Sequence, residues 1–380
     1  MRILFALGVI GLIVLEVSLV YFIMPLPGSQ GMRSIEAAYF LHRSRWVLRA
    51  ILWTLVLASA WSASRAAGWR KWLVPASLLV VAGLTYFVNF RMSADRVFLQ
   101  PRTLVMKPAS TNSVAKERLV VGIEINGDAR AYPLQFIGYH HQVRDKVGGR
   151  EVLVSYCTVC RTGRVFSPLV NGRAETFRLV GMDHFNAMFE DQTTGSWWRQ
   201  ANGEAIRGPL KGTSLAEVPS RQTMLEQWLE LHPQSLIMQG DPTAAEKYAK
   251  DYAFERGTSR KKLTGTDTLS WRDKSWVLGV TVKGRSKAYD WNRLRRERVV
   301  NDEIGNVPIV LALASDNASF FVFERPDAKT RFHLRNDSLV AGAHAYGLTG
   351  RGEMGALSQV NASQEFWHSW RTFQPETERY

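Results

Sequence analysis

The stretch VGIEINGDARAY, Val121–Tyr132, decides the fold because it recurs without a gap as LGVTVKGRSKAY, Leu278–Tyr289. Each copy alternates apolar and polar residues before an Asn-Gly or Lys-Gly dipeptide, a pattern typical of a β-hairpin. Apolar residues at helical spacing close each copy, over Thr223 to Leu231 and Gln364 to Phe373, and stop before a proline. The sequence therefore predicts an α+β, β-rich soluble part built of two tandem homologous halves with pseudo-two-fold symmetry.

Three apolar segments precede this duplicated part, over residues 3–24, 46–63 and 72–90. Each has close to the roughly 20 residues that cross a bilayer core, so we predict three transmembrane helices. Glu16 lies within the first segment. We interpret it as a structural contact between helices rather than as part of a transport path, because no second acid accompanies it.

The composition shifts mark the expected domain boundaries. We expect a membrane domain over residues 1–96 and a first repeat over 97–240. A crossover linker over 241–275, which is charged and largely aperiodic, would lead to a second repeat over 276–380.

The charge and composition narrow the classes of partner. With 46% apolar and 22% charged residues in 380, the chain is not disordered. Half of the net charge of +14 precedes Val97 and flanks the apolar segments, where cations neighbour lipid headgroups. The basic runs lack the interleaved aromatics that stack on bases. We therefore expect a lipid bilayer as partner and no nucleic acid, while the loop charges slightly favour an internal soluble domain.

The two cysteines, Cys157 and Cys160, are the candidate catalytic residues, and they lie at a predicted strand end. A straight strand would send their side chains to opposite faces. A turn, which Gly163 permits, is needed to bring the sulfurs close enough for a disulfide or for one shared ion. The second copy has Ala314 and Asn317 at the corresponding positions. The fold therefore does not require the thiols, and we expect any chemistry in the first half.

Three functions fit this pair. The thiols can form a redox couple, which would make the protein a thiol oxidoreductase, with Arg161 and Arg164 as candidates to stabilise a thiolate. They can instead bind copper or zinc, or form a structural disulfide in a non-catalytic membrane scaffold.

A metal site would need further ligands, because two thiolates do not complete a zinc tetrahedron. The candidate ligands are a first histidine, His140, two further histidines, His141 and His184, and, for Cu(I), the methionines Met182 and Met188.

Several motifs, in this order, resemble a prokaryotic family, the domain of unknown function 3179 family. They are Ala131–Leu134 (AYPL), His140, Asp145, Tyr156–Cys160 (YCTVC), Asp191–Gln200 (DQTTGSWWRQ) and Gly208–Gly212 (GPLKG). The resemblance covers nearly all of residues 115–380. It implies a family of unestablished biochemical activity, some of whose members are described as selenoproteins.

Selenocysteine in place of a cysteine would favour redox chemistry, an implication that we carry only to Cys157 and Cys160. The family often has Pro after the first cysteine and Glu after the histidine, where this chain has Thr158 and His141. Many relatives look exported. The resemblance therefore favours an extracytoplasmic soluble domain. Together with the three apolar segments, it leads us to expect a multi-pass protein of the bacterial plasma (inner) membrane. The redox function would add a membrane or redox protein as a possible partner.

Overall fold

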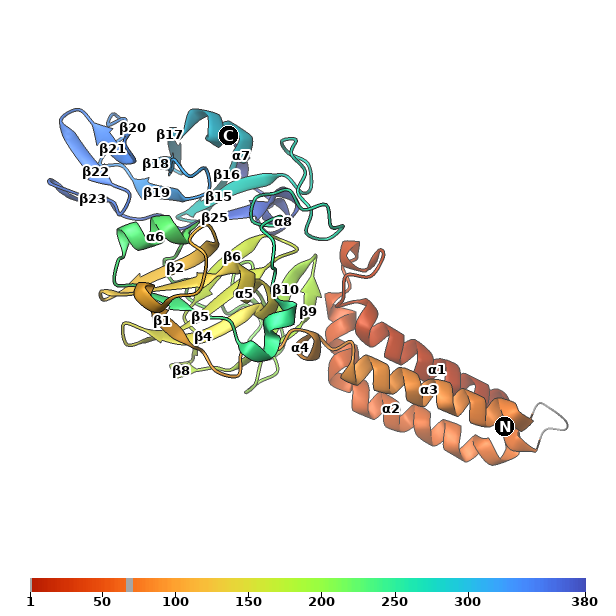
Figure 1. Ribbon diagram of the computed structural model, residues 1–380. Coiled ribbons are helices and arrows are strands. Elements are labelled where there is room, and N and C mark those ends of the chain that lie inside the picture. Colours follow the sequence, from red (N-terminus) through yellow and green to blue (C-terminus); the bar gives the residue numbers. More distant parts are fainter. Residues whose placement is uncertain (1, 66–70) are drawn as a thin grey trace. The chain divides into compact units, whose positions relative to one another are not determined.

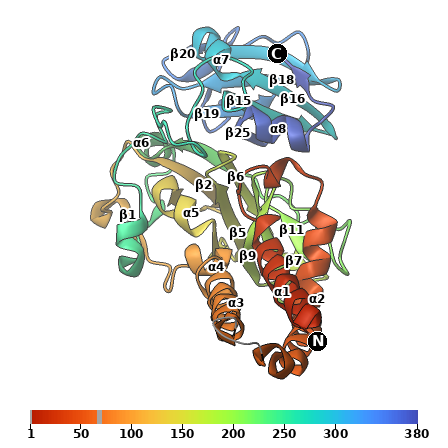
Figure 2. The same cartoon turned by 90° about the vertical axis from the view of Figure 1, so that its right-hand side faces the viewer.

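The computed structural model describes residues 2–65 and 71–380 and shows a strand-rich α+β protein that begins with three long helices (Figures 1 and 2). The chain divides into two compact units. The first unit comprises residues 1–98, 177–198 and 205–211, and the second comprises residues 99–176, 199–204 and 212–380.

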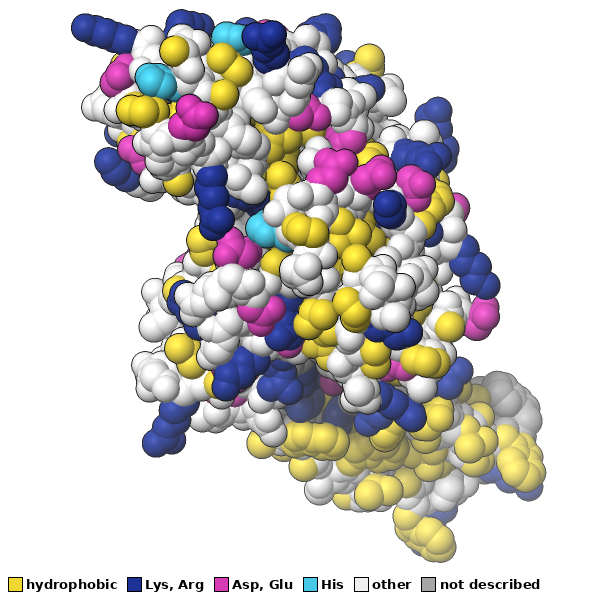
Figure 3. Space-filling model, turned by 60° about the vertical axis from the view of Figure 1, so that its left-hand side comes forward, with side chains coloured by type: hydrophobic (Ala, Val, Ile, Leu, Met, Phe, Trp, Pro, Cys, Tyr) yellow, Lys and Arg dark blue, Asp and Glu magenta, His cyan; other side chains and the backbone are white. Residues whose placement is uncertain are grey.

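The three helices of the first unit are α1 (Arg2–Tyr21), α2 (Ile35–Ser64) and α3 (Leu73–Phe90). All three are long and apolar enough to cross a membrane, which confirms the prediction of three helices of this kind. α2 begins at Ile35, well before the predicted start at residue 46. α1 packs against both α2 and α3. Large apolar side chains cover much of their exposed surface (Figure 3). Lipid rather than water is the solvent that such a surface favours.

A buried ion pair holds the helices together. The Arg49 guanidinium of α2 donates to both Glu16 carboxylate oxygens of α1, at 2.7 and 2.8 Å, and to the Asn89 side chain of α3 at 3.0 Å. Glu16 is fully buried. A carboxylate in such a place needs an opposite charge, so this contact sets the register of the three helices.

A four-stranded sheet in the order β12-β11-β10-β9 continues this unit. Its strands are β9 (Phe177–Asp183), β10 (Asn186–Asp191), β11 (Trp197–Arg199) and β12 (Ala205–Arg207). The Met182 N–H donates to the Ile23 carbonyl at 2.7 Å, just after α1 ends. A Cβ on Gly181 would lie 2.4 Å from that carbonyl oxygen, so glycine permits the approach. The short helices α4 (Ala94–Val97) and η1 (Ser29–Gly31) complete the unit.

The second unit contains a first group of elements around one core. They are β1 (Met106–Pro108), η3 (Ala109–Thr111), β2 (Leu119–Ile125), β3 (Asp128–Pro133), α5 (Leu134–His140), β4 (Gln142–Val147), β5 (Arg150–Cys157), β6 (Thr162–Phe166), β7 (Leu169–Val170), β8 (Arg173–Ala174), β13 (Arg221–Met224), α6 (Leu225–Leu231) and β14 (Leu236–Met238). They form a sheet in the order β1-β14-β3-β2-β13 and a meander β4-β5-β6.

A second group follows η4 (Pro242–Lys247). Its elements are β15 (Trp276–Val282), β16 (Arg285–Asp290), α7 (Trp291–Glu297), β17 (Val299–Ile304), β18 (Val307–Leu313), β19 (Phe320–Glu324), β20 (His333–Arg335), β21 (Ser338–Ala341), β22 (His344–Gly347), β23 (Arg351–Gly352), β24 (Gly355–Ala356), β25 (Ala362–Phe366), α8 (Trp367–Phe373) and β26 (Glu378–Arg379). They form the sheets β25-β15-β16-β26, β17-β18-β19 and β20-β21-β22-β23-β24.

The order and pairing of the first group recur in the second. β13 and β25 each pair antiparallel with the first strand of a hairpin, β2 or β15. β14 and β26 each run parallel to its second strand, β3 or β16. The closing helices α6 and α8 are shorter than predicted, because residues 221–224 and 362–366 extend along the hairpins as strands.

A glycine and a tryptophan meet at the same place in both groups. A Cβ on Gly122 of β2 would lie 2.4 Å from the Trp228 ring of α6, and one on Gly279 of β15 would lie 2.2 Å from the Trp370 ring of α8. Both rings are buried. Each helix therefore packs directly on a glycine of its hairpin.

We predict that Gly122→Ala and Gly279→Ala each lower the free energy of unfolding by about 1–3 kcal/mol, because the added methyl group overpacks the core. Gly83→Ala in α3 is the control, since a Cβ there meets no described atom within 4 Å. Thermal unfolding of the detergent-solubilised protein, followed by near-ultraviolet circular dichroism, measures the difference. Equal midpoints for the three variants would contradict this packing.

Candidate functional site

Cys157 and Cys160 lie in the second unit, at the turn between β5 and β6. Cys157 ends β5, and Arg161 adopts a positive φ of 58° that reverses the chain. The turn therefore uses Arg161 rather than Gly163, which lies in β6 opposite Tyr156. Both cysteines are fully buried thiols. The Cys160 side chain hydrogen-bonds with Cys157, so the turn brings the two sulfurs within reach of each other.

Residues from β25 and α8 cover this turn. The Phe366 N–H donates to the Cys160 carbonyl at 2.9 Å. The Ser369 hydroxyl hydrogen-bonds with the Cys160 thiol and donates to a Glu365 carboxylate oxygen at 2.9 Å. Arg164 of β6 donates to the other Glu365 oxygen at 2.7 Å. The thiols are thus enclosed by polar side chains, most of which come from the second group of elements.

Lys274 supplies a positive charge beside the turn. Its ammonium group donates to the Val159 carbonyl at 2.8 Å and to the Leu263 carbonyl at 2.6 Å, and lies 3.3 Å from Nε2 of His368. Val159 stands between the two cysteines. Because Lys274 lies in the segment predicted to be a linker, that segment contributes to the site.

Burial and nearby charges shift the pKa values of the groups around the thiols. Burial, and next the hydrogen bond with Cys157, raise the pKa of the Cys160 thiol well above its ordinary value. Burial lowers the pKa of Lys274, while a charge on either cysteine would raise it. Burial also lowers the pKa of His368 to about 4. At neutral pH the site therefore holds a protonated Cys160 thiol and a neutral His368 imidazole.

Arg161, a predicted thiolate partner, points its guanidinium elsewhere. It donates to the Gln364 side chain at 2.8 Å and to the Phe254 and Glu255 carbonyls at 2.8 and 3.0 Å. Its guanidinium also lies 3.7 Å from the centroid of the Trp276 ring. This arginine therefore ties the turn to the segment before β15.

Two of the predicted metal ligands, His140 and His141, contact other residues of the second unit. In His140, Nε2 lies 2.8 Å from the Tyr248 hydroxyl and Nδ1 contacts the Leu99 carbonyl. His141 is buried and uses Nδ1 on the Tyr139 carbonyl at 3.0 Å.

The remaining candidates belong to the first unit: His184, whose Nδ1 lies 2.7 Å from Asp183, and the methionines Met182 and Met188. Within residues 2–65 and 71–380, three or more His, Cys, Asp or Glu side chains are nowhere grouped so that they could hold a metal.

The DQTTGSWWRQ motif has a structural use. The Asp191 carboxylate accepts hydrogen bonds from the Thr194 N–H, the Ser196 N–H at 3.0 Å and the Trp198 indole at 2.9 Å. This pattern is an Asx-type turn that closes the β10–β11 connection.

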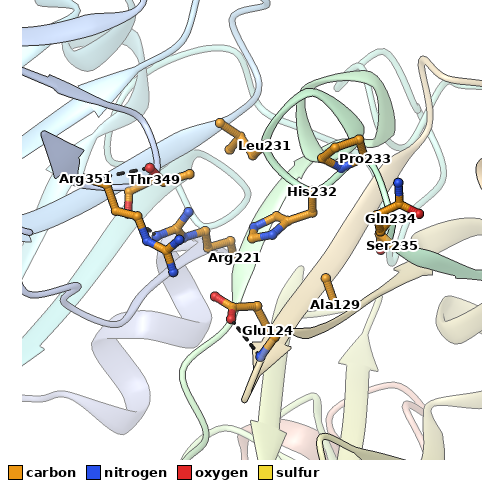
Figure 4. Close-up of a pocket in the computed structure, with 11 residues that line it drawn as sticks. Glu124, Ala129, Arg221, Leu231, His232, Pro233, Gln234, Ser235, Thr349 and Arg351 are labelled. Atoms are coloured by element: carbon orange, nitrogen blue, oxygen red, sulfur yellow. Dashed lines mark hydrogen bonds between the residues drawn. The ribbon is translucent and has the colours of Figure 1, made fainter.

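A cavity of about 320 Å³ elsewhere in the second unit has a polar lining that includes Glu124, Arg221, His232 and Arg351 (Figure 4). Arg221 donates to the Gln359 side chain at 3.0 Å and to the Thr349 carbonyl at 3.1 Å. Burial, and next the nearby Arg221, lower the pKa of His232 to about 4, and its ring lies 4.1 Å from that of Trp228. Since Arg221 already serves as a structural donor, we assign no chemistry to this cavity.

The residues that the sequence analysis missed are Lys274, Glu365 and Ser369. A comparison of the two recurring segments could have identified one of these residues, Glu365. Glu365 pairs with Val277 in β15, and Thr223 pairs with the corresponding Val120 in β2. The buried acid Glu365 stands where the aligned segment has Thr223, and this difference indicates that position 365 has a special role.

Residues 101–377 match the model of a family whose description is "Protein of unknown function (DUF3179)". Comparisons with curated proteins and with solved structures gave no match.

We predict a pH dependence of stability that comes from Cys160. Its pKa in the folded state is raised, whereas an unfolded thiol titrates near about 8.5. The protonated thiol therefore contributes stability that is complete below about pH 8.5 and is lost as pH rises toward the folded pKa. Urea unfolding at pH 7 and pH 10 should show a larger loss for the native protein than for Cys160→Ser. Other groups that titrate over this range are common to both proteins, so an equal loss would contradict the raised pKa.

Proposed function

The chain belongs to the DUF3179 family, and on that premise we propose that it is a membrane-associated protein in which Cys157 and Cys160 form a thiol–disulfide redox couple. The family description names no activity, so the site carries the proposal. The supporting observation is the hydrogen bond between the two side chains at a strand turn. Two thiols that hydrogen-bond with each other are neighbours in space, which a disulfide between them requires.

The proposed redox step balances two electrons and two protons. One thiol loses its proton, and the thiolate attacks a disulfide of an oxidised protein partner, which releases one partner thiol and leaves a mixed disulfide. The second cysteine, as a thiolate, attacks the mixed disulfide. The Cys157–Cys160 disulfide forms, the second partner thiol leaves, and the partner has gained both electrons.

Access to the sulfurs requires an opening of their cover. Both thiols are fully buried beneath Phe366 and Ser369 at the start of α8. Local opening of a helix end exposes such groups at a free energy below that of global unfolding. We therefore propose that the partner reacts with a transiently opened form, in which the Lys274 ammonium stabilises the thiolate.

We also propose that the soluble part consists of two homologous halves with pseudo-two-fold symmetry, residues 97–240 and 276–380. The recurring strand pairing and the matched Gly122–Trp228 and Gly279–Trp370 contacts support this. In this arrangement the second half, which lacks the cysteines, supplies the cover over the thiols of the first.

The two alternatives have less support. A zinc ion would need ligands that the described side chains around the thiols do not supply. Two thiolates suit Cu(I), but burial opposes their deprotonation. A scaffold with a structural disulfide would need a bridge that stays oxidised while the protein is folded, a behaviour that the redox titration below distinguishes.

We predict that the native protein in detergent, equilibrated in glutathione buffers and then alkylated, behaves as a reversible two-electron couple. Oxidation should remove two hydrogen atoms from the chain by intact mass and protect both cysteines from alkylation. Cys157→Ser and Cys160→Ser should each abolish this transition. Stoichiometric metal that is lost in Cys157→Ser would favour the metal site instead, and a pair that never oxidises while folded would contradict the redox role.

We predict that Lys274→Met shifts the pH profile of thiol alkylation upward by about one unit or more. The charges of Lys274 and of either cysteine act on each other, and a nearby opposite charge favours the thiolate by that order. Lys274→Arg keeps the charge and should keep the profile. Lys250→Met is the control, because Lys250 pairs only with the exposed Glu246 among described residues. A profile that Lys274→Met leaves unmoved would show that this lysine only supports the backbone.

A further inference from the structure

A cavity of about 510 Å³ lies at one end of the helix bundle, within the first unit. Its walls come from the last turns of α1 and α3, the first half of α2, the short helix α4 and the strands β9 and β10. The volume is in the range of small-molecule sites, about 300–1,000 Å³. Since α1 and α3 end here beside the polar strands β9 and β10, we take this end of the bundle as the place where the helices leave the bilayer.

The cavity has an excess of positive charge. The charged side chains in its lining, apart from a histidine, are four arginines and two acids: Arg45, Arg49, Arg96, Arg178, Asp95 and Glu190. Arg49 is neutralised by Glu16 inside the bundle. Arg178 pairs with Glu190 at 2.6 Å and with Asp95 at 3.4 Å. Among the described residues, neither Arg45 nor Arg96 forms an ion pair. Four arginines face three acids, Glu16 included, so the lining keeps one positive charge in excess.

Apolar side chains complete the walls next to these arginines. Leu19 and Val20 of α1 and Val88 and Phe90 of α3 face the same cavity. Trp46, also in the lining, is 67% exposed, as is typical of an aromatic residue at a membrane interface. A soluble phosphate ester would use only the cationic part of such a site. A molecule with an anionic head and a hydrocarbon tail would use both parts.

We propose that this cavity binds an anionic phospholipid, with its phosphate at Arg45 and Arg96 and its acyl chains along the apolar residues of α1 and α3. Guanidinium groups suit this role because they present paired donors to phosphate oxygens and remain charged at any physiological pH. The proposal is independent of the redox role of the thiols, and it gives the first unit a ligand of its own.

The test is native mass spectrometry of the full-length protein in detergent, titrated with phosphatidylglycerol or phosphatidylcholine. We expect phosphatidylglycerol to bind more tightly. One basic residue near a membrane surface contributes about a factor of five to the binding of an anionic lipid, so Arg45→Gln/Arg96→Gln should weaken phosphatidylglycerol binding about 30-fold. Arg45→Lys/Arg96→Lys should retain most of it. Arg65→Gln, which removes an exposed arginine just after the other end of α2, should leave it unchanged.

Several outcomes would overturn the proposal. Equal binding of the two lipids would remove the need for a cationic site. An unchanged preference in the double glutamine variant would place the lipid elsewhere, and competition by millimolar inorganic phosphate as effective as that by lipid would point to a soluble anion. If the double variant fails to fold, as judged by circular dichroism, Arg96→Gln alone is decisive, because Arg96 is exposed and its loss should still weaken binding about five-fold.

Discussion

The hydrogen bond from the Phe366 N–H to the Cys160 carbonyl, at 2.9 Å, joins β25 to the β5–β6 turn, and the arrangement around the thiols depends on it. The ion pair between Arg164 and Glu365, at 2.7 Å, reinforces the same junction. Burial raises the pKa of Glu365 while Arg164 opposes that rise, so the carboxyl group is stable in this place only with its partners. The β5–β6 turn and β25, which lie far apart in the chain, are therefore fixed against each other beside the thiols.

Burial and charge act against each other in this enclosure. Desolvation keeps the Cys160 thiol protonated, whereas the Lys274 ammonium beside Val159 favours a thiolate. Water that enters would remove the desolvation penalty but leave the lysine near the sulfurs. The reactivity of the pair in the proposed redox role is then set by how often α8 opens, which is a property of packing rather than of the thiols alone.

The first unit also contains ion pairs that neutralise charged side chains among its helices and strands. Glu16 and Arg49 neutralise each other within the helix bundle, and Asn89 adds a third helix to the contact. Arg178, Glu190 and Asp95 form a second network where the bundle meets β9 and β10. These ion pairs neutralise most of the charged side chains at that end of the bundle. Arg45 and Arg96 lie outside them, and in our proposal they bind the phosphate of an anionic lipid.

The recurrence of the hairpin motif, the three apolar segments and the family motifs are local patterns. From them the sequence by itself determined the α+β class, three helices long and apolar enough to cross a membrane, and the family. These features depend on periodicity and composition, which neighbouring residues carry.

The sequence predicted only part of the candidate site. Cys157 and Cys160 stand out because the recurring segment has Ala314 and Asn317 at the aligned positions, but alternation along a strand does not predict a reversal at Arg161. Only the tertiary structure decided that Glu365, Ser369 and Lys274 surround the thiols and that His140 contacts Tyr248 instead. The physical reason is that contacts between segments more than a hundred residues apart depend on how separate sheets pack, and no periodicity within either segment encodes that packing.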